Sequence, residues 1–358
     1  ILYMLNVAYI NLKTIKKNAV NIKSKLPAGC RFYAVVKADA YGHGAEEVAN
    51  AIYGVADGYC VSLPEEGVSL RLAGIDKEII VLAPAVKSDY KTAISYDLTL
   101  SASSEEDIVN ISAAAKKMKS AAKVHIAVNT GMNRFGENLP SLWKLIAAAK
   151  KSKLISVTGV YSHFYSPEDL SAVNRQCEIF GRAVNLIKEA FPEAVAHISA
   201  SGGFLQGKFY GGVRIGILLY GYYPFCGKSR IKVSVSPAMK VETRIVATGK
   251  AEKGQNLLYG DFTAKKSEKY FLVRYGYADG LPRTTVKNQL NNRCMDITAV
   301  NFDEISDGND LKTGKKIKKD GKFYILNKNA DKIAEKYGTI SYEILTSVAK
   351  RAKRVYLR

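Results

Sequence analysis

The chain has 358 residues, of which 47% are hydrophobic and 24% are charged. This length exceeds one ordinary domain and suits a large barrel with a second module, and the composition is that of a soluble globular protein. The five cysteines are an odd number without C-x-x-C spacing, which argues against a disulfide framework and a zinc site. We therefore expect reduced thiols in a cytoplasmic protein, and no metal.

Lysine and arginine number 53 against 33 acidic residues, which gives a formal net charge of +20. Such an excess can indicate a nucleic-acid partner. Here, however, the basic residues are scattered, and the densest run, Lys312–Lys322, is typical of a solvated hairpin. The charge predicts a lysine-rich surface without a nucleic-acid or membrane partner, and such a surface attracts anionic substrates at low salt.

The first ten residues are apolar but few and carry no basic leader, so they predict a strand rather than a signal peptide or membrane span. From about 11 to 225, helical and β-rich segments alternate. Helical periodicity covers 11–25, 44–54, 64–74, 103–118, 138–151 and 168–190. The β-rich runs are Arg31–Lys37, Asp57–Ser62, Glu78–Ala83, Asp97–Ser101, Lys123–Asn129, Ile155–His163, Ala194–Ala200 and Gly212–Tyr220. Eight such runs predict an α/β fold with an N-terminal (β/α)8 TIM-like barrel over 8–228.

Beyond about residue 230 the pattern becomes mostly β. Strand-like segments cover Ile231–Val246, Tyr270–Arg274, Cys294–Val300 and Gly321–Leu326, and only Asp331–Tyr337 has a clear helical pattern. We therefore expect a C-terminal β domain over 229–358, completed by residues 1–7 of the first strand.

Lys37 ends an apolar strand, which places it at the mouth of a barrel, where these folds carry their chemistry. Partial burial there lowers the pKa of a lysine and favours a neutral, nucleophilic amine. Tyr41, four residues on, can contact an anionic group beside it. The alternative is a strand-end lysine whose amine reaches solvent.

Two further segments carry buried or clustered charge. Arg214 lies inside an apolar strand and needs a buried partner, while Gly216 after it leaves backbone N–H groups for a phosphate; a structural ion pair is the alternative for Arg214. Arg134, in the loop after the fifth strand, can bind a carboxylate through two hydrogen bonds.

Tyr277 lies in a polar loop of the β domain and can act as an acid or base only if its pKa is lowered; interface packing is the alternative. The four histidines, His43, His125, His163 and His197, are not at metal-ligand spacing. The three that lie in or beside strands are as well explained as buried polar groups as by catalysis.

Together these segments closely resemble the alanine racemase family of fold-type III pyridoxal-phosphate enzymes, over nearly the whole chain. The two signatures are AVVKADAYGHG at 34–44 and GYADG at 276–280. The resemblance implies that Lys37 holds pyridoxal 5'-phosphate and that Tyr277 is the opposing acid/base, contributed across a homodimer interface. It assigns Tyr41, Ser201, Gly216 and Ile217 to the cofactor phosphate, Arg214 to the pyridine nitrogen, His163 to a link between Arg214 and Tyr277, and Arg134 and the Met295 backbone to the substrate carboxylate.

The implied activity is the interconversion of L- and D-alanine, a peptidoglycan precursor, by two bases on opposite faces of the substrate. A racemase of serine or another amino acid on the same scaffold is the first alternative. A fold-type III decarboxylase of basic amino acids would lack the signature at 276–280. A pyridoxal-phosphate carrier would consist of the barrel alone, so the 230–358 segment argues against it.

The sequence departs from the family on the substrate side. Ala127 stands where many members carry a carbamylated lysine, Asn129 replaces an aspartate, and Ala200 replaces an asparagine. Whatever positions Arg134 must therefore differ, with Asn129 and a water or an anion as candidates. Lys350 stands where an active-site tyrosine is often found, which opens the question of strict alanine specificity.

If Lys350 lines the pocket, Lys350→Tyr is expected to change the ratio of kcat/KM for alanine to kcat/KM for serine, because a rigid aromatic ring would replace a flexible cation. Steady-state assays with both substrates measure the ratio. An unchanged ratio would show that Lys350 does not select the substrate.

Overall fold

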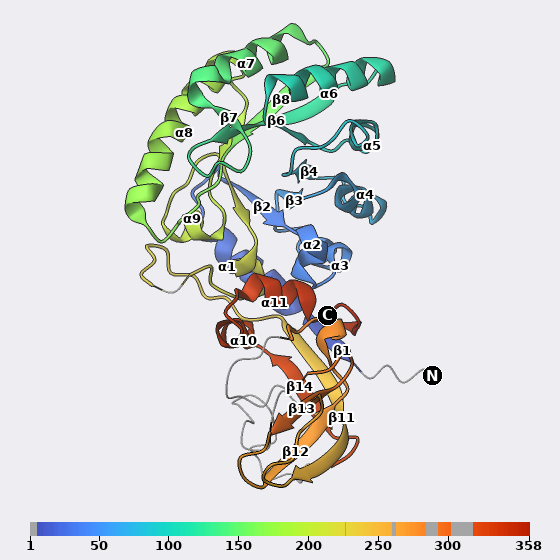
Figure 1. The fold of residues 1–358 in the computed structure, drawn as a ribbon. Helices are drawn as coiled ribbons and strands as arrows, with labels where there is room; N and C mark the ends of the chain where they lie inside the picture. Colours follow the sequence, from blue (N-terminus) through green and yellow to red (C-terminus); the bar gives the residue numbers. More distant parts are fainter. Residues whose placement is uncertain (1–5, 226, 260–262, 284–292, 302–317) are drawn as a thin grey trace. The chain divides into compact units, whose positions relative to one another are not determined.

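The computed structural model describes residues 6–225, 227–259, 263–283, 293–301 and 318–358 (Figure 1). The chain divides into two compact units. One, which we call the β unit, consists of residues 1–14, 41–44 and 237–358; the other, the barrel unit, consists of 15–40 and 45–236. The limits 8–228 and 229–358 expected from the sequence stay a prediction for the functional domains.

The barrel unit contains all eight expected parallel strands. They are β2 (Arg31–Val35), β3 (Gly58–Val61), β4 (Glu78–Val81), β5 (Leu100–Ala102), β6 (Ala122–Asn129), β8 (Ile155–Tyr161), β9 (Val195–His197) and β10 (Gly212–Ile215). Their burial is nearly continuous, as in β3 and β10, because in a barrel one face meets the interior and the other meets helices.

Backbone hydrogen bonds link these strands into a ring. One sheet has the order β10-β2-β3-β4 and the other β5-β6-β8-β9, with the two-residue β7 (Glu137–Asn138) beside β6. The amide of Val81 donates to Thr99 O (2.9 Å), which joins β4 to the segment before β5. The amide of Arg214 donates to Ser199 O (2.8 Å), which joins β10 to the segment after β9. The α/β barrel expected from the sequence is thereby confirmed.

Helices follow the strands around the ring (Figure 1). They are α1 (Leu12–Lys23), α2 (Lys37–Tyr41), α3 (Ala45–Ala51), α4 (Pro64–Leu72), α5 (Tyr90–Ser95), α6 (Glu105–Met118), α7 (Leu142–Lys151), α8 (Leu170–Ala190) and α9 (Ser201–Leu205), with 3-10 turns η1 (Leu139–Ser141) and η2 (Ile217–Tyr220). The sequence pattern did not identify α5, which has six residues, or α9, which has five; both are too short to show a clear period.

Helix α6 shows why these residues form a helix. The Ser104 side chain accepts from the Asp107 amide (3.1 Å) and caps the N-terminus, whose first turn is acidic, while lysines occupy the last turn. Ile108, Ile111 and Ala115 are buried at helical spacing. The C-terminus ends at Lys119 in the left-handed conformation.

The β unit is built on one sheet. Its strands are β1 (Val7–Asn11), β11 (Met239–Ala251), β12 (Glu268–Val273), β13 (Thr298–Asn301), β14 (Lys322–Asn327) and β15 (Lys353–Leu357), with the order β13-β12-β11-β1-β15 and β14 also on β11. Strand β1 pairs with β11 antiparallel and with β15 parallel, so the first strand belongs to this sheet. Phe271 and Phe323 pack edge to face at 5.3 Å between ring centroids in its core.

Several expectations for the β unit were wrong. Strand β11 begins at Met239, not Ile231, and β13 begins at Thr298, because the preceding residues form irregular loops. The expected helix is α10 (Ala330–Lys336), but a second helix, α11 (Ser341–Ser347), and strand β15 follow it. Each has seven residues or fewer, too few to show a clear period. Part of the basic run Lys312–Lys322, residues 312–317, lies outside the described residues.

Among the helices of the described ranges, none combines the length and the apolar content that a bilayer crossing requires.

Ile111→Ala is expected to lower the free energy of unfolding by about 2–5 kcal/mol, because it leaves a cavity under α6. Val109 is on the same helix but is 54% exposed, and Val109→Ala should change stability by no more than about 0.5 kcal/mol. Urea unfolding of both variants tests the packing of α6. Equal losses would contradict it.

Candidate functional site

Lys37 lies two residues after the last residue of β2, Val35, at the carboxyl end of the barrel strands, where the sequence placed it. Its side chain is partly buried, and burial lowers the pKa of the amine. The Arg134 guanidinium lowers this pKa further, and Arg214 acts in the same direction. Lys37 is thus closer to its neutral, nucleophilic form at physiological pH than a free lysine is.

The backbone after Lys37 turns in the left-handed sense. Ala38, Asp39, Ala40 and Tyr41 all have φ between 50° and 53°. For residues with a Cβ this conformation costs about 1–2 kcal/mol each. Strain of this kind is found where surrounding contacts enforce it and is concentrated at functional sites.

Two carboxylates hold this turn. Glu66 accepts from the Ala38 amide (2.6 Å) and also from the amides of Ser62 and Leu63. Asp39 accepts from the Ala45 amide (2.8 Å). Glu66 could not be singled out from the sequence, where its only signal is its place in the first turn of a helix. Its effect is to fix the backbone on which Lys37 is carried.

Arg214 on β10 is buried and makes five hydrogen bonds through its two terminal nitrogens. Nη1 donates to His197 Nδ1 (2.6 Å) and His197 O (2.8 Å). Nη2 donates to Ser162 O (2.6 Å), to Ile198 O (3.2 Å) and to His163 Nδ1 (3.2 Å). Every one of these acceptors is neutral, so among the described residues Arg214 forms no direct ion pair.

His163 lies just beyond β8, and its Nδ1 accepts a hydrogen bond from the Arg214 guanidinium. Burial, and then the charge of Arg214, lower the pKa of His163 to about 3, so the ring is neutral at physiological pH. A neutral ring that accepts on Nδ1 carries its proton on Nε2. His163 can therefore receive a hydrogen bond from Arg214 and donate one on the other side.

Arg134 lies in the loop after β6, and Asn129 shapes that loop. The Asn129 side chain accepts from the amides of Gly131 (3.0 Å) and Asn133 (3.1 Å) and donates to Asn133 Oδ1 (2.8 Å). The Arg134 guanidinium lies over the Phe135 ring, 4.7 Å from its centroid. Asn129 therefore organises the loop by direct hydrogen bonds.

Arg134, Asn129 and His163 line one pocket, and the buried Ala127 lies in its wall. The structure thus brings together the predicted substrate arginine and the predicted linking histidine. Ala200, the other departure from the family, precedes α9 without a side-chain cap.

Ser201, Gly216 and Ile217 also come together in the barrel unit. The buried Ser201 hydroxyl oxygen accepts hydrogen bonds from the Gly216 amide (3.2 Å) and the Leu218 amide (3.5 Å). Ile217 begins the 3-10 turn η2 after β10. A hydroxyl beside converging backbone N–H groups suits a phosphate.

Tyr277 and Met295 lie side by side in the β unit. The Tyr277 amide donates to Cys294 O (3.1 Å), and the Ala278 amide donates to Met295 O (3.0 Å). The Tyr277 side chain is 39% exposed in the single chain. The loop is anchored by Tyr275, whose hydroxyl donates to Val348 O (2.6 Å) and also lies 3.0 Å from Asp279 O.

Tyr41 and Lys350 also belong to the β unit. The Tyr41 ring packs against Tyr342 at 5.8 Å between centroids, and Lys350 lies exposed in the turn after α11. The roles that the resemblance gives to these two residues stay predictions.

The fold and these contacts define an enzyme of the α/β-barrel class, with a partly buried lysine of lowered pKa at the carboxyl ends of its strands. Comparison with known proteins identifies the family. The family model "Alanine racemase, N-terminal domain" matches residues 10–224, and "Alanine racemase, C-terminal domain" matches 238–356.

Individual relatives agree with this match. The alanine racemase of Streptococcus pyogenes serotype M2 is 32% identical over 98% of both chains. The solved alanine racemase of Clostridium difficile is 29% identical with a TM-score of 0.89, covering 100% of this chain and 97% of that one. The Bacillus anthracis alanine racemase with bound L-Ala-P is 26% identical with a TM-score of 0.86, covering 100% and 96%. The chain belongs to the alanine racemase family and is an isomerase.

The barrel residues fit pyridoxal 5'-phosphate, the cofactor of this family. Lys37 supplies an amine of lowered pKa, and Ser201 with its converging amides suits the phosphate. The contacts of Arg214 use only Nη1 and Nη2, and within the described ranges no residue accepts from its Nε–H. That donor suits an unprotonated pyridine nitrogen, which can only accept.

Gly276→Ala is expected to remove most racemase activity and to lower the free energy of unfolding by about 3 kcal/mol. A Cβ there would lie 2.0 Å from Met295 O, so the backbone that pairs with the Tyr277 loop must move. Gly254→Ala is the control, because a Cβ at Gly254 meets nothing within 4 Å and costs only about 1–2 kcal/mol of left-handed strain. Thermal unfolding and racemase activity are measured for both variants. If Gly276→Ala were as active as Gly254→Ala, the Tyr277 loop would tolerate displacement.

Proposed function

We propose that this chain interconverts L- and D-alanine with pyridoxal 5'-phosphate, using Lys37 and Tyr277 as two bases on opposite faces of the substrate. Membership of the alanine racemase family supports the reaction. The observation that carries the residue assignment is the partly buried Lys37 amine, whose lowered pKa is set by burial together with Arg134 and Arg214. A cytoplasmic homodimer completes the proposal.

Each base has a distinct proton to handle. Lys37 would hold the cofactor until the substrate amine takes its place, which frees the Lys37 amine to act as a base. The bound cofactor would supply a conjugated ring that withdraws electrons from the substrate Cα and makes that C–H bond acidic. The Lys37 amine removes or returns the proton on one face, for which it must be neutral, and its lowered pKa favours that form. The Tyr277 hydroxyl donates or accepts on the other face. Because the two roles exchange with direction, both enantiomers are substrates.

The remaining charged residues orient the reactants. Arg134 binds the substrate carboxylate, and the Met295 backbone, which lies beside Tyr277, contacts the same group. Arg214 places a cationic donor against the pyridine nitrogen and disfavours its protonation, because a guanidinium has no acceptor. An unprotonated ring withdraws fewer electrons, which favours return of the proton over competing reactions.

Tyr277 is proposed to enter the active site of a partner subunit. Its side chain is 39% exposed in the single chain, while its backbone is fixed by Cys294 O and by the anchor at Tyr275. A rigid loop that presents an exposed tyrosine suits a residue donated across an interface. His163, which accepts from Arg214 and carries its free proton on Nε2, is proposed to orient that tyrosine.

Borohydride reduction of the loaded enzyme is expected to fix the cofactor on Lys37, as peptide mapping would reveal. Tyr277→Phe should retain this label but lower kcat in both directions by roughly 10²–10⁴, the usual contribution of one acid/base. Tyr259→Phe is the matched control, since Tyr259 is 78% exposed in the same unit. A label on another lysine, or full activity of Tyr277→Phe, would overturn the proposal.

A further inference from the structure

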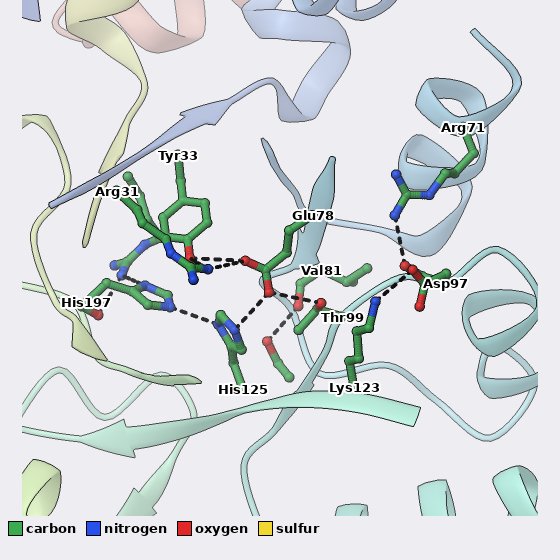
Figure 2. Close-up of polar contacts among 12 residues, drawn as sticks. Arg31, Tyr33, Arg71, Glu78, Val81, Asp97, Thr99, Lys123, His125 and His197 are labelled. Atoms are coloured by element: carbon green, nitrogen blue, oxygen red, sulfur yellow. Dashed lines mark hydrogen bonds and ion pairs between the residues drawn. The ribbon is translucent and has the colours of Figure 1, made fainter. Parts of the chain in front are cut away.

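Figure 2 shows polar side chains in a line from His197 through His125 to Glu78 at the amino end of β4, and Arg214 donates to His197 at the other end of this line. Arg214 Nη1 is 2.6 Å from His197 Nδ1, and His197 Nε2 is 2.8 Å from His125 Nδ1. His125 Nε2 then faces Glu78 Oε1 at 3.3 Å, a contact whose geometry falls short of a full hydrogen bond. Both imidazoles are fully buried.

The two ends of this line fix the protons between them. Arginine can only donate, so His197 Nδ1 must accept and its proton must lie on Nε2. That proton is donated to His125 Nδ1, which places the His125 proton on Nε2, toward Glu78. A carboxylate can only accept. One arrangement of tautomers therefore places a donor opposite an acceptor at every contact, and each donor points away from Arg214.

Glu78 has the charge that this arrangement requires. Burial alone would raise its pKa, but contacts with His125, the Tyr33 hydroxyl (3.0 Å) and Arg31 (3.5 Å) lower it to about 2. Burial, and then the Arg214 charge, lower the pKa of His197 well below its usual value. An ionised acceptor and a neutral ring are the forms that the chain of donors needs.

We infer that Glu78 and His125 are positioning residues for Arg214: they fix the tautomer of His197 and thereby keep its Nδ1 as an acceptor for the guanidinium. If His197 carried its proton on Nδ1, that N–H and the N–H of Arg214 Nη1 would face each other at 2.6 Å with no acceptor between them. The two donors would repel each other and push Arg214 away. A doubly protonated His125 has the same effect, because it would donate to His197 Nε2 and force the His197 proton onto Nδ1.

Three strand glycines provide the space for this line. A Cβ at Gly159 would lie 2.5 Å from His125 Nε2, and a Cβ at either Gly58 or Gly212 would lie 2.9 Å from the Tyr33 ring. Glycine within a strand weakens it and marks a close approach. The Tyr161 ring stacks on His197, with 6° between the planes and 5.4 Å between centroids. The rings are therefore held in place by the barrel as well as by hydrogen bonds.

The consequence for catalysis rests on the proposed role of Arg214 at the pyridine nitrogen. Arg214 is a buried cation whose direct acceptors are all neutral. The carboxylate that balances it is Glu78, reached through two neutral rings that are polarised in the same sense. Without that carboxylate, nothing at the far end of the line favours the Nε2–H tautomers of His125 and His197. Arg214 is then free to reorient.

Nitrogen-15 NMR of histidine-labelled holoenzyme tests the inference directly, since the chain has only four histidines. Two-bond correlations distinguish a protonated ring nitrogen from an unprotonated one, and single substitutions assign the rings. We expect His125 and His197 both neutral with the proton on Nε2. A proton on His197 Nδ1, or a doubly protonated His125, would overturn the inference in the unmodified protein.

Three substitutions then test the dependence on Glu78. Glu78→Met removes both carboxylate oxygens that face His125 and should populate the Nδ1–H form of His197. Glu78→Gln keeps one acceptor oxygen and should keep His197 in the Nε2–H form. Asp97→Asn is the control, because Asp97 pairs with Lys123 in solvent. We expect kcat/KM to fall by between about twofold and thirtyfold in Glu78→Met, the range for mutations along a coupled network.

Unchanged tautomers in a folded Glu78→Met enzyme would contradict the role of Glu78. Altered tautomers with unchanged kcat/KM would confirm the proton arrangement and contradict its link to Arg214. Failure of the proposed function would instead appear as the absence of racemisation or of the Lys37 label in the unmodified enzyme, so the two outcomes are distinguishable.

Discussion

The burial of one guanidinium, that of Arg214, is the constraint on which the barrel interior depends. A buried cation is tolerated only when it finds hydrogen-bond acceptors, and here two backbone segments and two imidazoles accept from its two terminal nitrogens. Satisfying those imidazoles in turn requires a carboxylate further away, at Glu78. The polar interior is thus one connected network, and glycines in three strands give its rings room.

Much of the fold could be predicted because the barrel strands are continuous apolar runs and the longer helices keep a regular period. Helix α6 shows both the cap and the buried stripe in its sequence. Helix α11 and strand β15 could not be found this way, because seven and five residues carry too little periodicity. Their place depends on tertiary pairing, such as that of β15 with β1.

The site divides in the same way. Lys37 and Arg214 are visible in the sequence because a charged residue within or at the end of an apolar strand is conspicuous. Glu66 and Asn129 are not, since an acidic residue at a helix start and an asparagine in a loop are common; their roles appear only in the amides they bind. For His125 and His197 the sequence leaves a buried polar role and a catalytic role equally open, because sequence alone does not show that their strands bring the two rings within 2.8 Å.

The left-handed turn after Lys37 and the network around Arg214 serve the same end. Four consecutive residues with positive φ are costly, and the turn persists because Glu66 accepts from its Ala38 amide while the Asp39 side chain accepts from the amide of Ala45 beyond it. Arg214 is likewise held by acceptors whose own protons are fixed. Catalysis by proton transfer depends on placing groups within fractions of an ångström. A strained backbone under the lysine and a buried polar network behind the arginine both give up stability, and both reduce the number of positions that these two residues can take.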